Sequence, residues 1–277
     1  MYPKGKIIIS GHTITQEYDE TGAVVKRSIA TNHLFQLISH EKEHRIEIVS
    51  SASKDCEELL KACCESLLQS KHTHFGIINI NKADDEYNSR ICNANTIILI
   101  GEPSEIYSFF CAGFLTELVY STYLTDENFT LIGINTAAMA LSDLMIGTKK
   151  AEAGLGLIKN CFINLPFGNH SDFKKLIKTV LSHQNYLGVN INGDMSITIE
   201  RGFKTLCKGT GSVMIINARE VSSKSLKPFK RGASLYVKNL KGQILVDGSR
   251  VDLRTGNIIK PDKFDFNLNF TNRNSII

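Results

Sequence analysis

The sequence lacks the features that mark an exported or membrane-embedded protein. No apolar run reaches the roughly 18 residues that a membrane-spanning helix needs, and no charged-then-apolar segment stands at the N-terminus. We therefore expect a cytoplasmic protein that has no membrane partner. The chain also contains no internal repeat and no low-complexity segment, so a repeat architecture is not expected.

Patterns that bind metal ions are missing as well. The seven cysteines include no CxxC pair, and most of them lie inside apolar stretches, which predicts reduced, buried thiols. Two histidine pairs, His40 with His44 and His72 with His74, have no cysteine or carboxylate nearby at a ligand spacing. The sequence therefore predicts no metal site and no cofactor.

The charge of the chain is close to balanced. Its net charge is +4 over 277 residues, and the one local cluster of cations runs from Lys224 to Arg231. We interpret this cluster as a solvated loop and expect no nucleic-acid partner. The hydrophobic fraction of 42% is typical of a globular protein that buries a full core.

Short apolar strands alternate with amphipathic helices over much of the chain. Apolar residues that recur every three or four positions predict helices, such as the one at 53–68, which Ser53 would cap. Strands 75–80 and 96–100 are nearly continuous β-branched runs, so we expect both faces of each strand to be covered. Strands are expected at residues 6–10, 45–50, 75–80, 96–100, 130–134 and 187–191, and helices at 53–68, 105–123, 137–146 and 172–181.

This alternation predicts an α/β protein with right-handed crossovers. From Ser196 onward, short strands separated by Arg201-Gly202 and by the segment 208–211 predict an antiparallel hairpin series. We expect a three-layer α/β/α fold with a central, mostly parallel sheet and an antiparallel C-terminal hairpin extension. Residues 1–220 would form the main domain, and residues 221–277 a β extension packed on it. Within that extension, the alternating segment 264–270 would add an edge strand or a subunit contact.

The segment from Leu131 to Asp143 predicts a buried strand, a tight turn and a helix. Many α/β hydrolases present a catalytic nucleophile on such an elbow. Here the apex holds Asn135, whose amide cannot attack a carbonyl as an alkoxide or thiolate can. Thr136, one residue further, is expected to cap the following helix. The scaffold therefore indicates a hydrolase, whereas the residue at its centre does not.

Four stretches resemble the serine peptidase family of cyanophycinase and dipeptidase E. Residues 3–11 resemble the Lys-Gly-x-Leu start of that family, and residues 98–104 its Gly-Gly-Asp-Gln turn. Residues 132–146 resemble its Gly-Thr-Ser-Ala-Gly-Ala-Ala elbow with Ser-Asp-x-Met-Ile, and residues 154–176 its Gly-Leu-Gly-Leu and Asp-x-His-Phe segments. The resemblance implies a three-layer α/β fold, frequent dimers, and cleavage after aspartyl residues by a serine, a histidine base and backbone oxyanion donors.

The resemblance also implies where each functional residue would lie. The family's serine falls on Asn135, and its histidine falls on Pro166, which has no proton-accepting side chain. The second glycine of the oxyanion turn falls on Glu102, which Pro103 follows. An acidic pair of the family falls on Asn192-Gly193, and the arginines that follow its histidine fall on His170, Asp172 and Lys175.

Loss of the nucleophile together with the base predicts a catalytically inactive relative. It would act as a binding or assembly subunit, linked to the metabolism of cyanophycin or β-aspartyl peptides. We expect a homodimer or a heteromer with an active relative. Thr136, His170, Asp172 and Lys175 are the candidate pocket residues for a peptide ligand.

The alternative is a hydrolase of aspartyl peptides with rewired active-site residues. A replacement nucleophile would come from Thr136, Cys161 or Ser104. His170 and Asp172 would then form a replacement acid–base pair.

Overall fold

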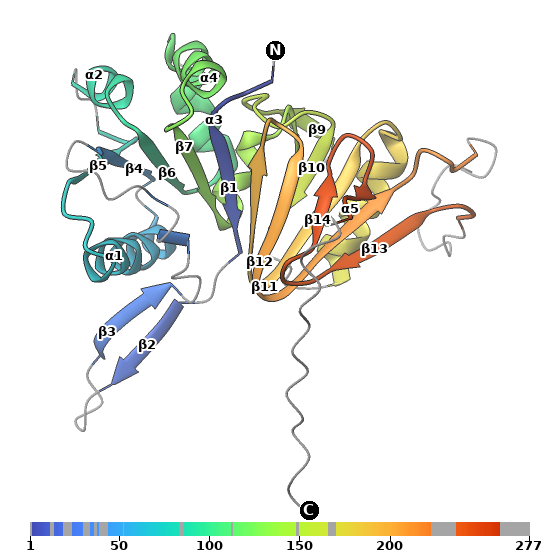
Figure 1. Ribbon diagram of the computed structural model, residues 1–277, viewed down its shortest axis with the longest axis horizontal. Coiled ribbons are helices and arrows are strands. Elements are labelled where there is room, and N and C mark those ends of the chain that lie inside the picture. The colour runs from blue at the N-terminus through green and yellow to red at the C-terminus, as the bar shows by residue number, and fades with distance from the viewer. Residues whose placement is uncertain are drawn as a thin grey trace, which may run out of the picture.

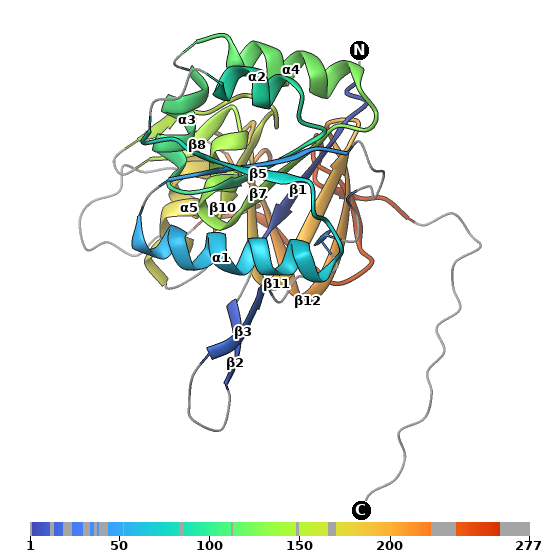
Figure 2. The same ribbon diagram turned by 90° about the vertical axis from the view of Figure 1, so that its left-hand side faces the viewer.

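The computed structural model of the chain has three layers, with helices on both faces of one large mixed sheet (Figures 1 and 2). The sheet has 11 strands in the order β15-β14-β12-β11-β1-β7-β6-β4-β5, and β10 and β13 pair with β11 and β12. The expected three-layer α/β fold is confirmed. The structure describes residues 2–11, 14–18, 24–29, 34–35, 38, 44–51, 53–82, 86–111, 113–147, 150–165, 170–222 and 237–260.

Five parallel strands form one half of the sheet. In spatial order they are β1 (Lys6–Ser10), β7 (Thr130–Ile134), β6 (Thr96–Ile100), β4 (Ile46–Ser50) and β5 (Phe75–Asn79). Strands β7, β6 and β4 are buried throughout, as strands covered on both faces should be. For β5 that expectation is wrong: it is the edge strand, and Ile77 is exposed because the flanking helices cover the strands further inside.

Helix α1 (Lys54–Gln69) covers one face of these strands (Figure 2). It begins as expected at Ser53, whose hydroxyl accepts a hydrogen bond of 3.3 Å from the backbone N–H of Cys56. The opposite face is covered by α2 (Tyr87–Cys92), α3 (Pro103–Cys111) and α4 (Leu115–Thr125).

The helix expected at 105–123 is therefore two helices, α3 and α4. The chain leaves the first helix near Gly113, a residue with low helix propensity. The hydroxyl of Thr116 donates to the carbonyl of Phe110 at 2.9 Å and so satisfies a carbonyl at the end of α3.

The helix expected at 137–146 is also different. Residues Asn135–Leu141 form a 3₁₀ helix, η2, and the next residues form the short strand β8 (Leu144–Ile146). Strand β8 pairs with β9 (Ala151–Ala153), so pairing with a later segment replaces the helical hydrogen bonds.

The other half of the sheet is antiparallel and is dominated by a hairpin of β11 (Leu187–Glu200) and β12 (Lys204–Asn217). The turn expected at Arg201-Gly202 is confirmed, with positive φ at both residues. The break expected at 208–211 is wrong, because these residues lie inside β12, opposite residues 193–196 of β11. A Cβ at Gly209 or Gly211 would lie within 2.2 Å of a carbonyl oxygen of β11, so these glycines permit close approach and do not mark a turn.

Smaller elements complete the fold. Strands β2 (Ile14–Tyr18) and β3 (Val24–Ile29) pair with each other as a separate antiparallel two-stranded sheet. Helix α5 (His170–Ser182) packs on β10 (Cys161–Asn164), β11 and β12. Beyond β12 the sheet continues with β13 (Lys241–Leu245), β14 (Arg250–Asp252) and β15 (Asn257–Ile258). The cation cluster 224–231 and the segment 264–270 lie outside the described residues. None of the helices in the described ranges combines the length and apolarity needed to cross a membrane.

A buried carboxylate ties the outer strands to α2. The side chain of Glu47 on β4 is fully buried and pairs with two guanidinium groups, Arg45 (Nη2 to Oε1, 2.7 Å) and Arg90 (Nε to Oε1, 3.2 Å). Arg90 also donates to the carbonyl of Ile77 on the edge strand at 3.0 Å. A Cβ at Gly76 would lie 2.7 Å from the Glu47 carboxylate, so the missing side chain makes room for this cluster.

We expect Glu47→Gln to lower the free energy of unfolding by about 2 kcal/mol, since it leaves two guanidinium groups facing a neutral amide. The loss is smaller than for a fully buried pair because both arginines keep part of their exposure to water. Urea unfolding of the full chain measures it. Glu57→Gln on the exposed face of α1 is the matched control and should change stability by less than about 0.5 kcal/mol. Equal stability of the two variants would contradict this role for Glu47.

Candidate functional site

Two strands converge on the same edge of β11 from opposite directions. Strand β1 runs antiparallel to β11 and ends with Ser10 opposite Ser196, whereas β10 runs parallel to β11 and ends with Asn164 opposite Asn190. The carboxyl ends of both strands therefore face each other across residues 191–195. In α/β sheets, ligands bind outside the carboxyl ends of strands at such a change of direction. The meeting point of these two strand ends is the candidate site.

The predicted elbow lies beside this meeting point, at the end of β7, which neighbours β1. Asn135 follows the strand directly with φ +52° and begins η2. Asparagine is one of the few residues other than glycine that tolerate this left-handed region. A Cβ at Gly133 would lie 2.6 Å from Cα of Ala138, so the helix packs directly on the strand that precedes it. The structure thus has the strand–turn–helix geometry of a nucleophile elbow, with an amide at the apex.

Thr136 links the elbow to the neighbouring strand. Its hydroxyl donates to the carbonyl of Gly101, at the end of β6, at 3.1 Å. The expectation that Thr136 caps the following helix is wrong, because no side chain caps η2 and this hydroxyl is bonded to another strand. Since its proton is directed at a backbone carbonyl, Thr136 is poorly placed to act as a nucleophile.

The turn after β6 differs from a glycine-rich oxyanion loop. Pro103 is the first residue of α3, where its fixed φ suits a helix start and its missing N–H costs nothing. The side chain of Glu102 is exposed, while its carbonyl accepts from the backbone N–H groups of Glu105 and Ile106 at 3.1 Å each. The turn is therefore built to start a helix.

A glycine-rich loop fixes the far end of the elbow helix. The N–H groups of Leu155 and Leu157 donate to the carbonyls of Ala140 and Leu141 at 2.8 and 3.0 Å. A Cβ at Gly154 would lie 2.1 Å from the carbonyl oxygen of Ser142, so only glycine fits there. The segment that resembles Gly-Leu-Gly-Leu thus has a structural role, which holds η2 in position.

A buried amide pair lies where β10 meets β11. The Nδ2 of Asn164 donates to Oδ1 of Asn190 at 2.9 Å, and both side chains are buried. Sequence reasoning did not single out Asn190, although a polar residue inside an otherwise apolar strand was a signal. Leu165, which follows Asn164 in the chain, is buried. Its Cδ2 atom would lie 3.5 Å from a Cβ placed on Gly11. Leu165 therefore fills space between the ends of β1 and β10.

The other predicted site residues are less closely assembled. Asn192 was expected after a strand, but it lies exposed inside β11, because that strand continues past Gly193, whose φ is +67°. His170, Asp172 and Lys175 lie in the first turns of α5. Pro166 lies outside the described residues, so the structure does not place the position that corresponds to the family's base.

Cys161 is unsuited to nucleophilic chemistry. Its thiol is fully buried, and burial, reinforced by the negative charge of Asp143, raises its pKa to about 12. Asp143 accepts hydrogen bonds from the hydroxyl of Tyr186 at 3.1 Å and from the N–H of Asn160 at 3.4 Å. These bonds join the chain leaving η2 to β10 and β11. Within the described ranges, no group of three or more His, Cys, Asp or Glu side chains could hold a metal ion.

The positive φ at residue 135 can be tested with a pair of variants. Asn135→Gly and Asn135→Ala both remove the amide, but only glycine adopts this backbone conformation without strain. We expect the glycine variant to be more stable by about 1 kcal/mol, measured by urea unfolding. An alanine variant at least as stable as the glycine variant would show that the elbow is not strained.

Thiol labelling tests the burial of Cys161. In the native protein, we expect iodoacetamide to label the exposed Cys92 and Cys111 quickly and Cys161 slowly at pH 8, because a thiol with a raised pKa forms almost no thiolate there. Peptide mass spectrometry measures the rates, and unfolding in urea should remove the difference. Fast labelling of Cys161 in the folded chain would reopen its role as a nucleophile.

Comparisons with known proteins agree with the resemblance in sequence. No protein-family model matches the chain. The cyanophycinase of Synechococcus elongatus is 29% identical over 134 residues, which is 44% of this chain and 42% of that protein. The cyanophycinase of Trichormus variabilis is 32% identical over 100 residues, 36% of this chain and 34% of that protein. The chain thus spans about two fifths or less of the length of the relatives it matches.

Among solved structures, a protein assigned to peptidase E from Listeria monocytogenes aligns with 74% of this chain and 98% of its own, at 12% identity and a TM-score of 0.49. The relationship therefore rests on the sequence matches: over a little under half of its length, the chain is similar to cyanophycinases.

Proposed function

We propose that this chain is a catalytically inactive relative of the cyanophycinases that acts as a binding or assembly subunit. The observation that carries the proposal is Asn135, which follows β7 at φ +52° and begins η2. The position retains the backbone of a nucleophile elbow, and its side chain cannot form a covalent intermediate.

The surroundings of the elbow support this reading. Thr136, the nearest hydroxyl in sequence, donates to the carbonyl of Gly101, and Cys161 is buried with a raised pKa. Removal of triad members lowers rates by about 10⁴-fold to 10⁶-fold in serine peptidases. Leu165 further reduces the space between the strand ends where a substrate would enter. A fold without a nucleophile at the elbow or an accessible replacement beside it is better suited to binding than to turnover.

The proposed setting is the metabolism of cyanophycin or of β-aspartyl peptides, because the relatives are cyanophycinases. In that setting, the chain would form a homodimer or pair with an active relative, and a peptide would be its ligand. His170, Asp172 and Lys175, in the first turns of α5, are the proposed polar contacts for such a peptide.

The alternative proposal is a hydrolase of aspartyl peptides with a new nucleophile. One observation favours it: Ser104 is exposed in the first turn of α3, directly after the turn that Thr136 contacts. A fluorophosphonate probe distinguishes the two proposals. An adduct on Ser104 or Thr136 in the intact mass and peptide map would support the hydrolase, and an unmodified chain would remove its main support.

We expect the purified chain to release no dipeptide from cyanophycin and no product from β-aspartyl peptides, because the elbow has no nucleophile. Chromatography of the reaction mixture measures product, and an active cyanophycinase assayed in parallel is the positive control. Turnover that disappears in Thr136→Ala or Ser104→Ala would overturn the proposal of an inactive subunit. Turnover that all these variants retain would indicate a contaminating hydrolase, which repurification to constant specific activity would reveal.

A further inference from the structure

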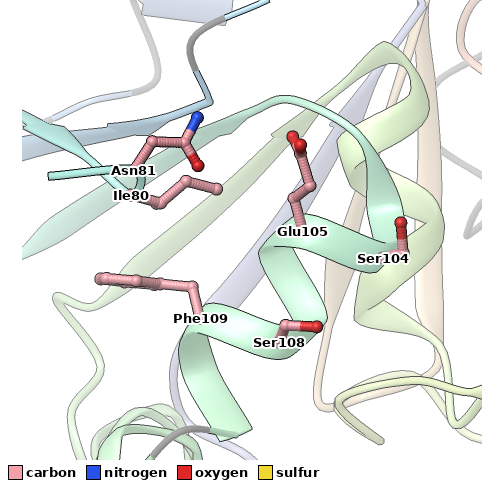
Figure 3. Close-up of a pocket in the computed structure, with 6 residues that line it drawn as sticks. All are labelled: Ile80, Asn81, Ser104, Glu105, Ser108 and Phe109. Atoms are coloured by element: carbon pink, nitrogen blue, oxygen red, sulfur yellow. The ribbon is translucent and has the colours of Figure 1, made fainter.

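A pocket lies between α3 and the carboxyl end of β5. It is an open pocket of about 430 Å³, lined by Ile80, Asn81, Ser104, Glu105, Ser108 and Phe109. Figure 3 shows Ile80 and Asn81 on one side, at the carboxyl end of β5, and the other four side chains on α3. Helix α3 also contacts η2, the helix that begins with Asn135, whereas Asn135 is not among the residues that line the pocket.

The spacing of the helical residues explains how the pocket forms. Ser104 and Ser108 are four residues apart, as are Glu105 and Phe109, so two adjacent rows of one helix present these four side chains together. Asn81 and Glu105 point toward the same space from opposite sides (Figure 3). Of the lining residues, only Ser104 lies within the four stretches on which the family resemblance rests.

The chemistry of the residues that line the pocket favours a positively charged ligand. Glu105 provides one carboxylate, and no described residue forms an ion pair with it. Asn81, Ser104 and Ser108 add neutral oxygens that can accept hydrogen bonds. The ring of Phe109 provides a π surface, which attracts cations. A carboxylate, several acceptors and an aromatic ring together match an organic cation that carries several N–H donors.

Two basic side chains are close to the lining residues in structure or sequence, and neither forms an ion pair with Glu105. Phe109 lies edge-on to Tyr87 with ring centroids 6.4 Å apart, and Arg90 lies over the Tyr87 ring at 5.8 Å. Arg90 is committed to the buried Glu47. Lys82 follows Asn81 in the chain and is exposed, and no ion pair joins it to Glu105.

We propose that this pocket is a binding site for an organic cation, a guanidinium or a primary ammonium group, held by Glu105 and stacked on Phe109. The proposal rests on the pocket alone, so it holds whether or not the chain hydrolyses peptides. In either case, the chain would recognise a basic side chain or a small basic metabolite beside the elbow without using the elbow itself.

Calorimetric titration of the full chain with three blocked amino acids tests the proposal. N-acetyl-arginine amide carries the guanidinium and N-acetyl-lysine amide the ammonium, and N-acetyl-citrulline amide is the neutral isostere of the first. We expect saturable binding of at least one cation and none of the citrulline compound. The two charged ligands show which cation the site prefers. Equal binding of citrulline, or no binding of either cation, would overturn the proposal.

Variants then locate the binding. Glu105→Gln keeps the shape of the side chain and removes its charge, so affinity should fall about tenfold, as expected for a hydrogen bond to a charged group. Phe109→Leu should weaken binding about threefold through loss of the cation–π contact. Glu117→Gln makes the same change on the exposed surface of α4 and should leave the affinity unchanged. Unchanged affinity in Glu105→Gln, in a variant with normal thermal stability, would place the cation elsewhere.

Discussion

The pairing of two strands with one edge of β11 is the constraint on which the rest of the site depends. Strand β1 pairs with residues 196–200 and β10 with residues 187–190, so their carboxyl ends meet over the middle of β11. Because β7 pairs with β1, this arrangement also places Asn135 beside the meeting point. The glycines of β12 allow the two long strands to stay close there. The positions of the elbow and of the two strand ends therefore follow from this one part of the sheet.

The elbow is held in place by contacts that do not depend on catalysis. Thr136 is bonded to the end of β6, and the glycine-rich loop that follows β9 is bonded to the end of η2. In both contacts the acceptor is a backbone carbonyl, and neither contact involves the side chain at position 135. A change of that side chain therefore leaves both contacts in place. This explains how the residue at position 135 can differ from a nucleophile while the surrounding fold persists.

Much of the fold could be predicted from local patterns, since buried β-branched runs and helical periodicity gave β1, β4, β6, β7 and α1 nearly residue by residue. The errors fell where tertiary contacts override local preference. The glycines of β12 suggested a turn because their close contact with β11 is invisible in the sequence. For the site, the apex Asn135 could be predicted from its strand–turn–helix context. The Thr136–Gly101 bond and the Asn164–Asn190 pair join segments far apart in sequence, so no local pattern could reveal them.

The guanidinium group of Arg90 makes two kinds of contact at once, one in the protein interior and one at the edge of the sheet. It neutralises Glu47 inside the protein and also occupies a carbonyl of β5, the strand that ends the sheet. Exposed edges of sheets recruit further strands from other molecules, and a charged side chain over such an edge opposes this. Loss of this one side chain would therefore disturb the interior charge balance and uncover a backbone carbonyl of the edge strand at the same time.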